Sequence, residues 1–268
     1  PQVISMDEDP LKAIRAKKEA SIVGCMQLLK EKKVEAVFSA GSTGATLISA
    51  ITILGKQKGV IRPAIASILP NSDSSVILLD SGASLDVKPK ILYQFAVMGS
   101  KLAEVLLELD NPRVGLLNNG EEESKGRDLE KSAYKLLSSS NLNFIGNVEG
   151  RDFATKKVDV FVTDGFTGNV VLKTLEGTAK LQQKLISDSL SKNLFKPLLP
   201  IVKNAFKPVK DKLNPDKTNA SYLLGVDGLV TIGHGSSKQE AIKNGIKYTN
   251  NSIQKDFIGK FSETLNEL

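Results

Sequence analysis

The 268-residue sequence has one cysteine, one histidine and no tryptophan. A single cysteine, Cys25, cannot form an intrachain disulfide, so the sequence favours a reducing, cytoplasmic setting. With one histidine and one cysteine, a clustered histidine–cysteine metal site is excluded, and we expect no metal. No apolar run approaches the roughly 20 residues that cross a bilayer, so we do not expect the chain to be an integral membrane protein.

Basic residues outnumber acidic ones, and the formal net charge is +6. This balance suits nucleic acid, an anionic membrane surface or an acidic protein as a partner. Aromatic residues make up only 5% of the chain, and no base-stacking motif is visible. We therefore expect no nucleic-acid partner.

Short apolar segments alternate with longer helical patterns over most of the chain. The expected strands are apolar on both faces, as buried parallel strands are, and span 34–39, 64–69, 76–80, 113–118, 143–147, 158–163 and 229–233. The helical patterns span 11–32, 44–56, 89–109, 129–138, 169–194 and 238–253. This alternation predicts one domain, 1–268, with a three-layer α/β/α sandwich and a largely parallel sheet.

Glycine and small polar or charged residues follow six of the expected strands, in the segments 39–45, 80–86, 118–126, 146–152, 164–169 and 233–237. Ligands of parallel α/β sheets bind beyond the carboxyl ends of the strands. We therefore expect all six loops to lie at one end of the sheet and to form the rim of an active site.

The loop 39–45 has the form of a phosphate cradle, in which backbone N–H groups and a helix dipole hold the anion. Its candidate phosphate-binding residues are Ser39, Gly41, Ser42, Thr43 and Gly44, and candidate cations in other loops are Lys125 and Arg151. The alternatives are a plain helix N-cap and solvated surface charges. Because the loop matches neither a dinucleotide fingerprint nor a P-loop, it does not indicate nucleotide binding.

Four further residues are candidates for catalysis. His234 lies between two glycines before a helix, which suits a proton donor or an oxyanion stabiliser; the alternative is a packed imidazole that fills the turn. Asp164 follows an apolar strand and either orients another group or caps the next helix. Asn169 offers a neutral donor for a carbonyl oxygen, and Lys173 offers a mobile positive charge.

The segment 191–213 combines six lysines and one acid with interleaved apolar residues, and prolines divide it into two short amphipathic pieces. Together with the preceding helical pattern it predicts a helical hairpin, 178–213. A basic hairpin with an apolar tip is typical of proteins that bind an anionic bilayer peripherally. The tip residues are Leu198, Leu199, Ile201 and Val202. The alternative is a hairpin that packs in a dimer.

Seven longer motifs carry a family resemblance, namely SAGSTGA, LLDSGASLD, QFAVMG, GLLNNGEEESKG, FIGNVEGRD, DVFVTDGFTGNVVLKTLEG and LLGVDGLVTIGHGSS. In order and spacing they resemble the bacterial PlsX family. The resemblance implies an isocitrate-dehydrogenase-like or phosphotransacetylase-like α/β/α fold and a homodimer. It also implies peripheral membrane association and transfer of a long-chain acyl group from acyl carrier protein to inorganic phosphate, for phospholipid synthesis. The family requires no metal or nucleotide, so no cofactor is expected.

Two kinds of departure separate the sequence from this family. Ser42 and Ser84 stand where the family usually has Asn, and the family's opening DAMGGD segment is not in the sequence, so we expect further sequence upstream. Without a Ser-His-Asp order or an activated cysteine, direct displacement is favoured over an acyl-enzyme. Two alternatives remain: a phosphotransacetylase-like enzyme that uses coenzyme A, and a membrane-bound scaffold that binds acyl carrier protein.

Overall fold

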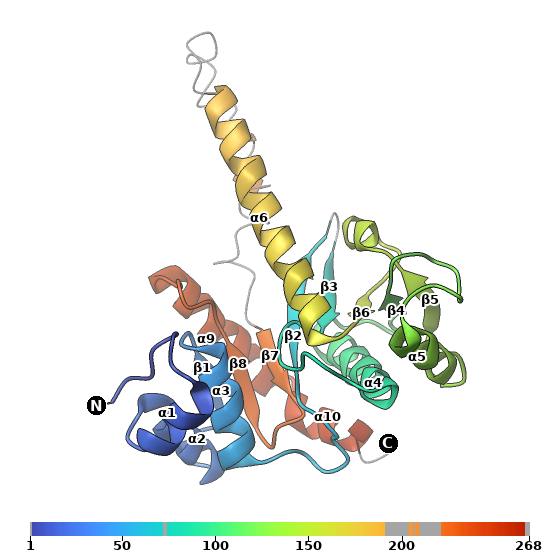
Figure 1. Ribbon diagram of the computed structural model, residues 1–268. Coiled ribbons are helices and arrows are strands. Elements are labelled where there is room, and N and C mark those ends of the chain that lie inside the picture. The colour runs from blue at the N-terminus through green and yellow to red at the C-terminus, as the bar shows by residue number, and fades with distance from the viewer. Residues whose placement is uncertain (1, 72–73, 191–203, 206, 209–220, 266–268) are drawn as a thin grey trace.

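A computed structural model describes residues 2–71, 74–190, 204–205, 207–208 and 221–265 (Figure 1). Its centre is an eight-stranded sheet with the strand order β1-β8-β7-β2-β3-β6-β4-β5. The strands are β1 Ala36–Ser39, β2 Ala64–Pro70, β3 Ser75–Leu79, β4 Val114–Leu117, β5 Phe144–Val148, β6 Val160–Val162, β7 Ser221–Leu224 and β8 Leu229–Ile232. Seven of them fall on the expected segments, whereas β7 was not predicted.

The sheet consists of two parallel blocks joined by antiparallel strands. β1 pairs in parallel with β8, and β3, β6, β4 and β5 form a second parallel block. Between the blocks, β7 is antiparallel to both β8 and β2, and β2 is antiparallel to β3. The α/β class with a mostly parallel sheet is confirmed, and the antiparallel centre is an addition to it.

These strand directions correct the expected placement of the glycine-rich loops. β1 and β8 run opposite to β3, β4, β5 and β6, because two antiparallel pairings with β7 and a third with β3 lie between the blocks. The loops after β1 and β8 therefore leave one end of the sheet, and the other four leave the opposite end. The prediction that all six loops share one end is wrong.

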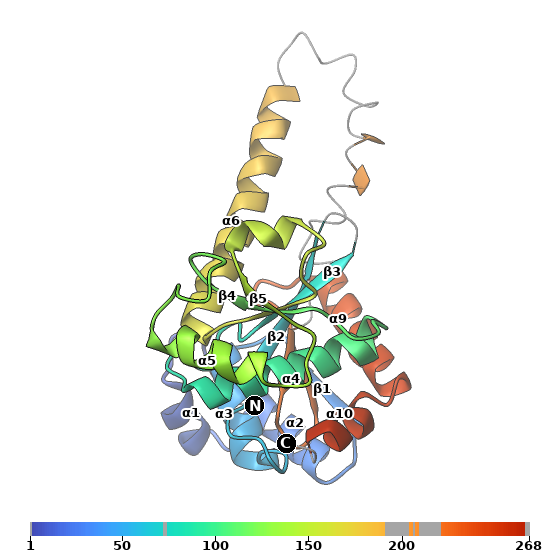
Figure 2. The same ribbon diagram turned by 90° about the vertical axis from the view of Figure 1, so that its right-hand side faces the viewer.

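Helices cover both faces of the sheet (Figures 1 and 2). Alternate residues of β2 show this division: Ala66 packs in the core beneath α4 (Pro89–Leu106), α5 (Asp128–Ser138), α9 (Gln239–Gln254) and α10 (Phe257–Leu265). Ile65 and Leu69 pack on the other face, beneath α2 (Ser21–Lys30), the π-helix η1 (Ala50–Leu54) and α6 (Gly165–Leu190). The α/β/α layering follows from this alternation.

The expected helix at 11–32 is divided in two. Asp9 caps α1 (Pro10–Ala16) by accepting a hydrogen bond from the backbone N–H of Lys12 at 2.8 Å. After α1 the chain extends, and Ala20 makes a bridge with Gln2 before α2 begins. α1 then packs against α3 (Thr43–Ser49), the helix that follows β1.

The longest helix, α6, begins four residues earlier than expected and has 26 residues. It extends well beyond the sheet in both views (Figures 1 and 2). The proposed apolar tip, Leu198, Leu199, Ile201 and Val202, lies outside the described residues. Among the residues that are described, no helix is both long and apolar enough to span a bilayer.

Candidate functional site

The structure brings the glycine loop and His234 together at one end of the sheet. In the parallel pairing of β1 with β8, Ser39 lies opposite Ile232. The backbone N–H of Gly233 then donates to the carbonyl oxygen of Ser39 at 2.8 Å. Because this bond continues the ladder past the strand ends, the loops 39–45 and 233–237 leave the sheet as neighbours. Two segments nearly 200 residues apart in sequence therefore form one surface.

Hydroxyl groups hold the glycine loop in shape. Ser42 is the N-cap of α3, and its Oγ accepts from the backbone N–H of Ala45 at 3.3 Å. Ser39 Oγ contacts Thr46 Oγ1 at 2.9 Å. Gly41 and Thr43 are exposed, and the N–H groups that open a helix have no partner within it. The loop can therefore present backbone donors to an anion, although its N-cap geometry is also present.

His234 is exposed beside this loop. Its Nδ1 lies 3.1 Å from the backbone nitrogen of Ser236 and 2.7 Å from Ser236 Oγ. The backbone N–H of Ser237 donates to the carbonyl oxygen of His234 at 2.9 Å, which closes the turn. The imidazole is not a packed filler of the turn, and its Nε2 edge points away from these contacts.

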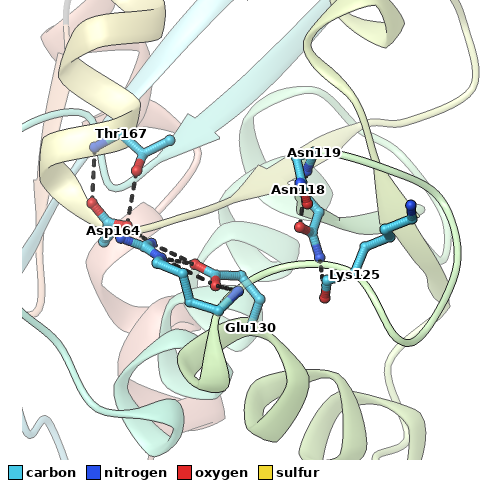
Figure 3. A network of polar contacts seen from close by, with 7 residues as sticks. Asn118, Asn119, Lys125, Glu130, Asp164 and Thr167 are labelled. Carbon is cyan, nitrogen blue, oxygen red and sulfur yellow. Dashed lines mark hydrogen bonds and ion pairs between the residues drawn. The ribbon is translucent and has the colours of Figure 1, made fainter.

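A second polar cluster lies where α6 begins (Figure 3). Asp164 and Glu130 are both buried, and the guanidinium of Arg127 bridges them. Arg127 Nη2 donates to Asp164 Oδ2 at 2.6 Å and to Glu130 Oε1 at 2.5 Å. Thr167 donates to Asp164 twice, from its backbone N–H at 2.8 Å and from its hydroxyl at 2.9 Å. Asp164 thus both caps α6 and binds a cation.

Hydrogen bonds outweigh burial in setting the pKa values of the two carboxyl groups in this cluster. Burial acts to raise the pKa of Asp164, but donation by Thr167 and Arg127 outweighs it and holds the pKa below its ordinary value. For Glu130, burial is likewise outweighed by hydrogen bonds from Arg127, and its pKa is also lowered. The pKa of Arg127 is raised by the hydrogen bonds to Glu130 and Asp164. All three groups are therefore charged at neutral pH.

Asp80 organises the loop beneath α6. Its carboxylate is fully buried and accepts only backbone N–H groups: Ile65 at 3.0 Å, Gly82 at 3.1 Å, Ala83 at 3.0 Å and Ser84 at 2.7 Å. Burial raises the pKa of Asp80, and these donors oppose that effect. The loop in turn supports α6, since the backbone N–H of Gly165 donates to the carbonyl oxygen of Ser84 at 2.8 Å.

We expect Asp80→Asn to destabilise the fold by about 1–3 kcal/mol. Both carboxylate oxygens accept N–H groups, so an amide must turn its own NH₂ toward backbone donors that then lose their acceptor. Asp86→Asn, at an exposed position of the same loop, is the control and should change stability by less than about 0.5 kcal/mol. Urea denaturation measures both; equal effects of the two substitutions would contradict this role of Asp80.

The other predicted cations are not gathered around the glycine loop. Lys125 follows β4 and Arg151 follows β5, at the opposite end of the sheet. Lys125 Nζ lies 3.9 Å from Glu122 Oε1, and Arg151 forms an ion pair with Glu149. Lys173, two turns into α6 and exposed, pairs with Glu176: its Nζ lies 3.0 Å from Glu176 Oε2. Each of these cations has a local carboxylate partner.

Asn169 is also exposed on α6, and its side chain lies against the backbone of Gly82. It belongs with Asp164 in the cluster at the start of α6, not with His234. Asn118 lies in the neighbouring loop, where its Nδ2 donates to the carbonyl oxygen of Lys125 at 3.2 Å (Figure 3). The described residues contain no group of three or more His, Cys, Asp or Glu side chains placed to hold a metal ion.

Arg127 was not among the residues predicted from the sequence. The predicted cations were those nearest to the glycine-rich segments, whereas Arg127 stands three residues before Glu130, at the N-cap of α5. The spacing Arg127–Glu130 predicts a local ion pair at a helix start. Nothing in the sequence indicates that the same guanidinium also reaches Asp164, because that contact depends on the pairing of β4 with β6.

Comparison with known proteins places the chain in a family. The family model described as "Fatty acid synthesis protein" matches residues 1–260. The chain belongs to the fatty acid synthesis protein family. Within it, the "Phosphate acyltransferase" of Elusimicrobium minutum (strain Pei191) is 43% identical over 268 residues, covering 100% of this chain and 79% of that protein. The "Phosphate acyltransferase" of Pelotomaculum thermopropionicum (strain DSM 13744 / JCM 10971 / SI) is 46% identical over 255 residues, with coverages of 95% and 75%.

Two solved structures have a fold similar to that of this chain. The EutD phosphotransacetylase from Staphylococcus aureus is 15% identical, with a TM-score of 0.54 over 91% of this chain and 67% of that one. A phosphotransacetylase from Streptococcus pyogenes is 17% identical, with a TM-score of 0.56 over 87% and 67% of the two chains. The motif resemblance and the phosphotransacetylase-like fold are both confirmed. As a member of the fatty acid synthesis protein family with phosphate acyltransferase relatives, the chain is an acyltransferase.

Proposed function

We propose that this chain transfers a long-chain acyl group from acyl carrier protein to inorganic phosphate, which yields acyl phosphate for phospholipid synthesis. The observation that carries the proposal is the match of the entire chain, at 43% identity, to a phosphate acyltransferase. The fold supports the same reaction class. Two solved structures with this fold are phosphotransacetylases, enzymes that by name transfer an acetyl group to or from phosphate.

The reaction depends more on aligning phosphate with the thioester than on base catalysis. Phosphate is already ionised near neutral pH, so an oxygen of the anion can attack the thioester carbonyl directly once the two are aligned. The C–O bond forms, a tetrahedral oxyanion collapses, and the C–S bond breaks to release the thiolate. We assign phosphate to the backbone donors of Thr43 and Gly44 and to that of Gly41, which donates weakly to Ser39 Oγ at 3.4 Å, and the carbonyl to the adjacent His234.

The cluster at the start of α6 follows β6, at the end of the sheet opposite to His234, so its role in the proposal is to position α6. Asp164, Arg127 and Thr167 fix the first turn of α6, and the exposed Asn169 begins the next turn. In the proposal Asp164 is a positioning residue for α6, and Asn169 and Lys173, at the same end of the sheet, do not contact the thioester held at His234. Lys125 and Arg151 also leave the sheet at that end, so they do not contact phosphate held by the glycine loop.

The charge of the chain supports the choice of partners. A net charge of +6 attracts acyl carrier protein, which is acidic, and also an anionic membrane surface. We propose a cytoplasmic protein that associates peripherally with the membrane through residues 198–202 and that forms a homodimer.

The test is phosphate-dependent release of carrier-protein thiol from palmitoyl-acyl carrier protein, with palmitoyl-coenzyme A assayed in parallel. We expect turnover with the carrier-protein thioester, dependence on added phosphate and a much slower reaction with coenzyme A. Faster turnover with coenzyme A would instead support a phosphotransacetylase-like acyltransferase. Binding of the carrier protein without any thiol release would contradict an enzymatic role and support a scaffold.

A further inference from the structure

The immediate surroundings of His234 determine where its proton lies. Nδ1 is 3.1 Å from the backbone nitrogen of Ser236 and 2.7 Å from Ser236 Oγ. A hydroxyl can donate or accept, but a backbone N–H can only donate. Nδ1 must therefore offer a lone pair to that N–H. We propose that Ser236 is a positioning residue whose backbone N–H holds the His234 ring with its hydrogen on Nε2, as a hydrogen-bond donor toward substrate.

The turn keeps this geometry in place. The carbonyl oxygen of His234 accepts from Ser237, while Gly233 donates to Ser39, so both sides of the turn are bonded to neighbouring backbone. The turn also lies close to Met6, since a methyl group built on Gly235 would overlap the Met6 methyl group. Because Nδ1 is occupied, only the Nε2 edge of the exposed ring is free to meet a ligand.

The tautomer with hydrogen on Nε2 suits this reaction, because it can donate a hydrogen bond to the substrate. The inference rests on the proposed acyl transfer to phosphate, in which the nucleophile carries its own charge and needs no base. An Nε2–H group can donate a hydrogen bond to the carbonyl oxygen as it becomes the tetrahedral oxyanion, without proton transfer. A histidine with a free lone pair at Nε2 could not do so.

The single histidine makes the tautomer directly measurable. In the full-length chain labelled with ¹⁵N, long-range ¹H–¹⁵N correlations arise from one imidazole only. At a pH where the ring is neutral, we expect the pattern of hydrogen on Nε2, both in the wild type and in Ser236→Ala, which keeps the backbone N–H. A spectrum with hydrogen on Nδ1 in the wild type would overturn the assignment.

Amide substitutions test the donor role in turnover. We expect His234→Ala to lower kcat by about 10²–10³-fold. His234→Gln places an NH₂ group close to the position of Nε2 and should recover at least about tenfold of that loss, whereas His234→Asn, whose NH₂ mimics Nδ1, should not. If Gln is no better than Ala, or if Asn equals Gln, donation from Nε2 is overturned.

Ser236→Ala removes only the hydroxyl contact at 2.7 Å. We expect kcat to fall by about two- to tenfold with KM for phosphate unchanged, the size of one lost hydrogen bond. An unchanged kcat would overturn the role of the Ser236 hydroxyl. Ser139→Ala, at an exposed serine that ends α5, should leave turnover unchanged. If the wild type releases no thiol, the proposed function fails, and the ¹⁵N spectrum still decides the tautomer independently.

Discussion

Gly168→Ala is expected to destabilise the protein by about 3 kcal/mol or more, which is large for an alanine placed in a helix interior. Alanine normally stabilises a helix by about 1 kcal/mol relative to glycine. At Gly168, however, a methyl group would overlap the backbone carbonyl oxygen of Asp80. Backbone atoms cannot rotate aside as a side chain can, so either α6 or the loop that follows β3 must move.

The same helix supplies a control for this substitution. A methyl group on Gly177 meets no atom within 4 Å, so Gly177→Ala should stabilise the fold by about 0.5–1 kcal/mol. Urea denaturation of the two variants should give shifts of opposite sign. Shifts of the same sign would contradict the close contact between α6 and the peptide of Asp80.

Arg127→Ala is expected to cost about 2–3 kcal/mol of folding free energy, because it leaves Asp164 and Glu130 buried without their cation. Arg127 is itself 61% exposed, which keeps the cost at the lower side of the values seen for fully buried pairs. Lys131→Ala, at an exposed cation of the same helix, is the matched control and should change stability by less than about 0.5 kcal/mol.

The effect of Arg127→Ala should depend on pH. In the wild type the pKa values of Asp164 and Glu130 are lowered, so their contribution to stability is complete at neutral pH and is lost as pH falls through the lowered values. The difference between wild type and Arg127→Ala should therefore be largest near pH 7 and shrink below about pH 4. Denaturation at several pH values tests this; a difference that does not vary with pH would contradict the ion-pair network.

The positions of most strands could be predicted from sequence, and their directions could not. Apolar runs such as 158–163 are buried on both faces, which marks a strand whatever its partner is. Direction depends on the connection: only six residues separate the expected strands 64–69 and 76–80, too few for a parallel crossover. That spacing indicated the antiparallel β2–β3 pair, and neglecting it led to the wrong placement of the six loops.

The same distinction applies to the candidate site. The glycine loop and His234 have local signatures, and the structure places them together through the β1–β8 pairing. Arg127 has a local signature only for Glu130; its contact with Asp164 joins residues 37 positions apart and depends on sheet register. β7 was missed because its apolar run, Tyr222–Leu224, has only three residues and stands alone between polar residues and Gly225, whereas β6 lies within the longer apolar segment 158–163.

The pairing of β1 with β8 has a consequence for how the protein is made. In the described sheet, β1 is an edge strand whose partner is β8, almost 200 residues later. During synthesis from the amino end, β1 and its glycine loop must wait for nearly the whole chain before they can join the sheet. Closing so long a loop also slows folding. A chain that ends before residue 229 therefore lacks both His234 and the strand that holds β1 and its glycine loop in the sheet.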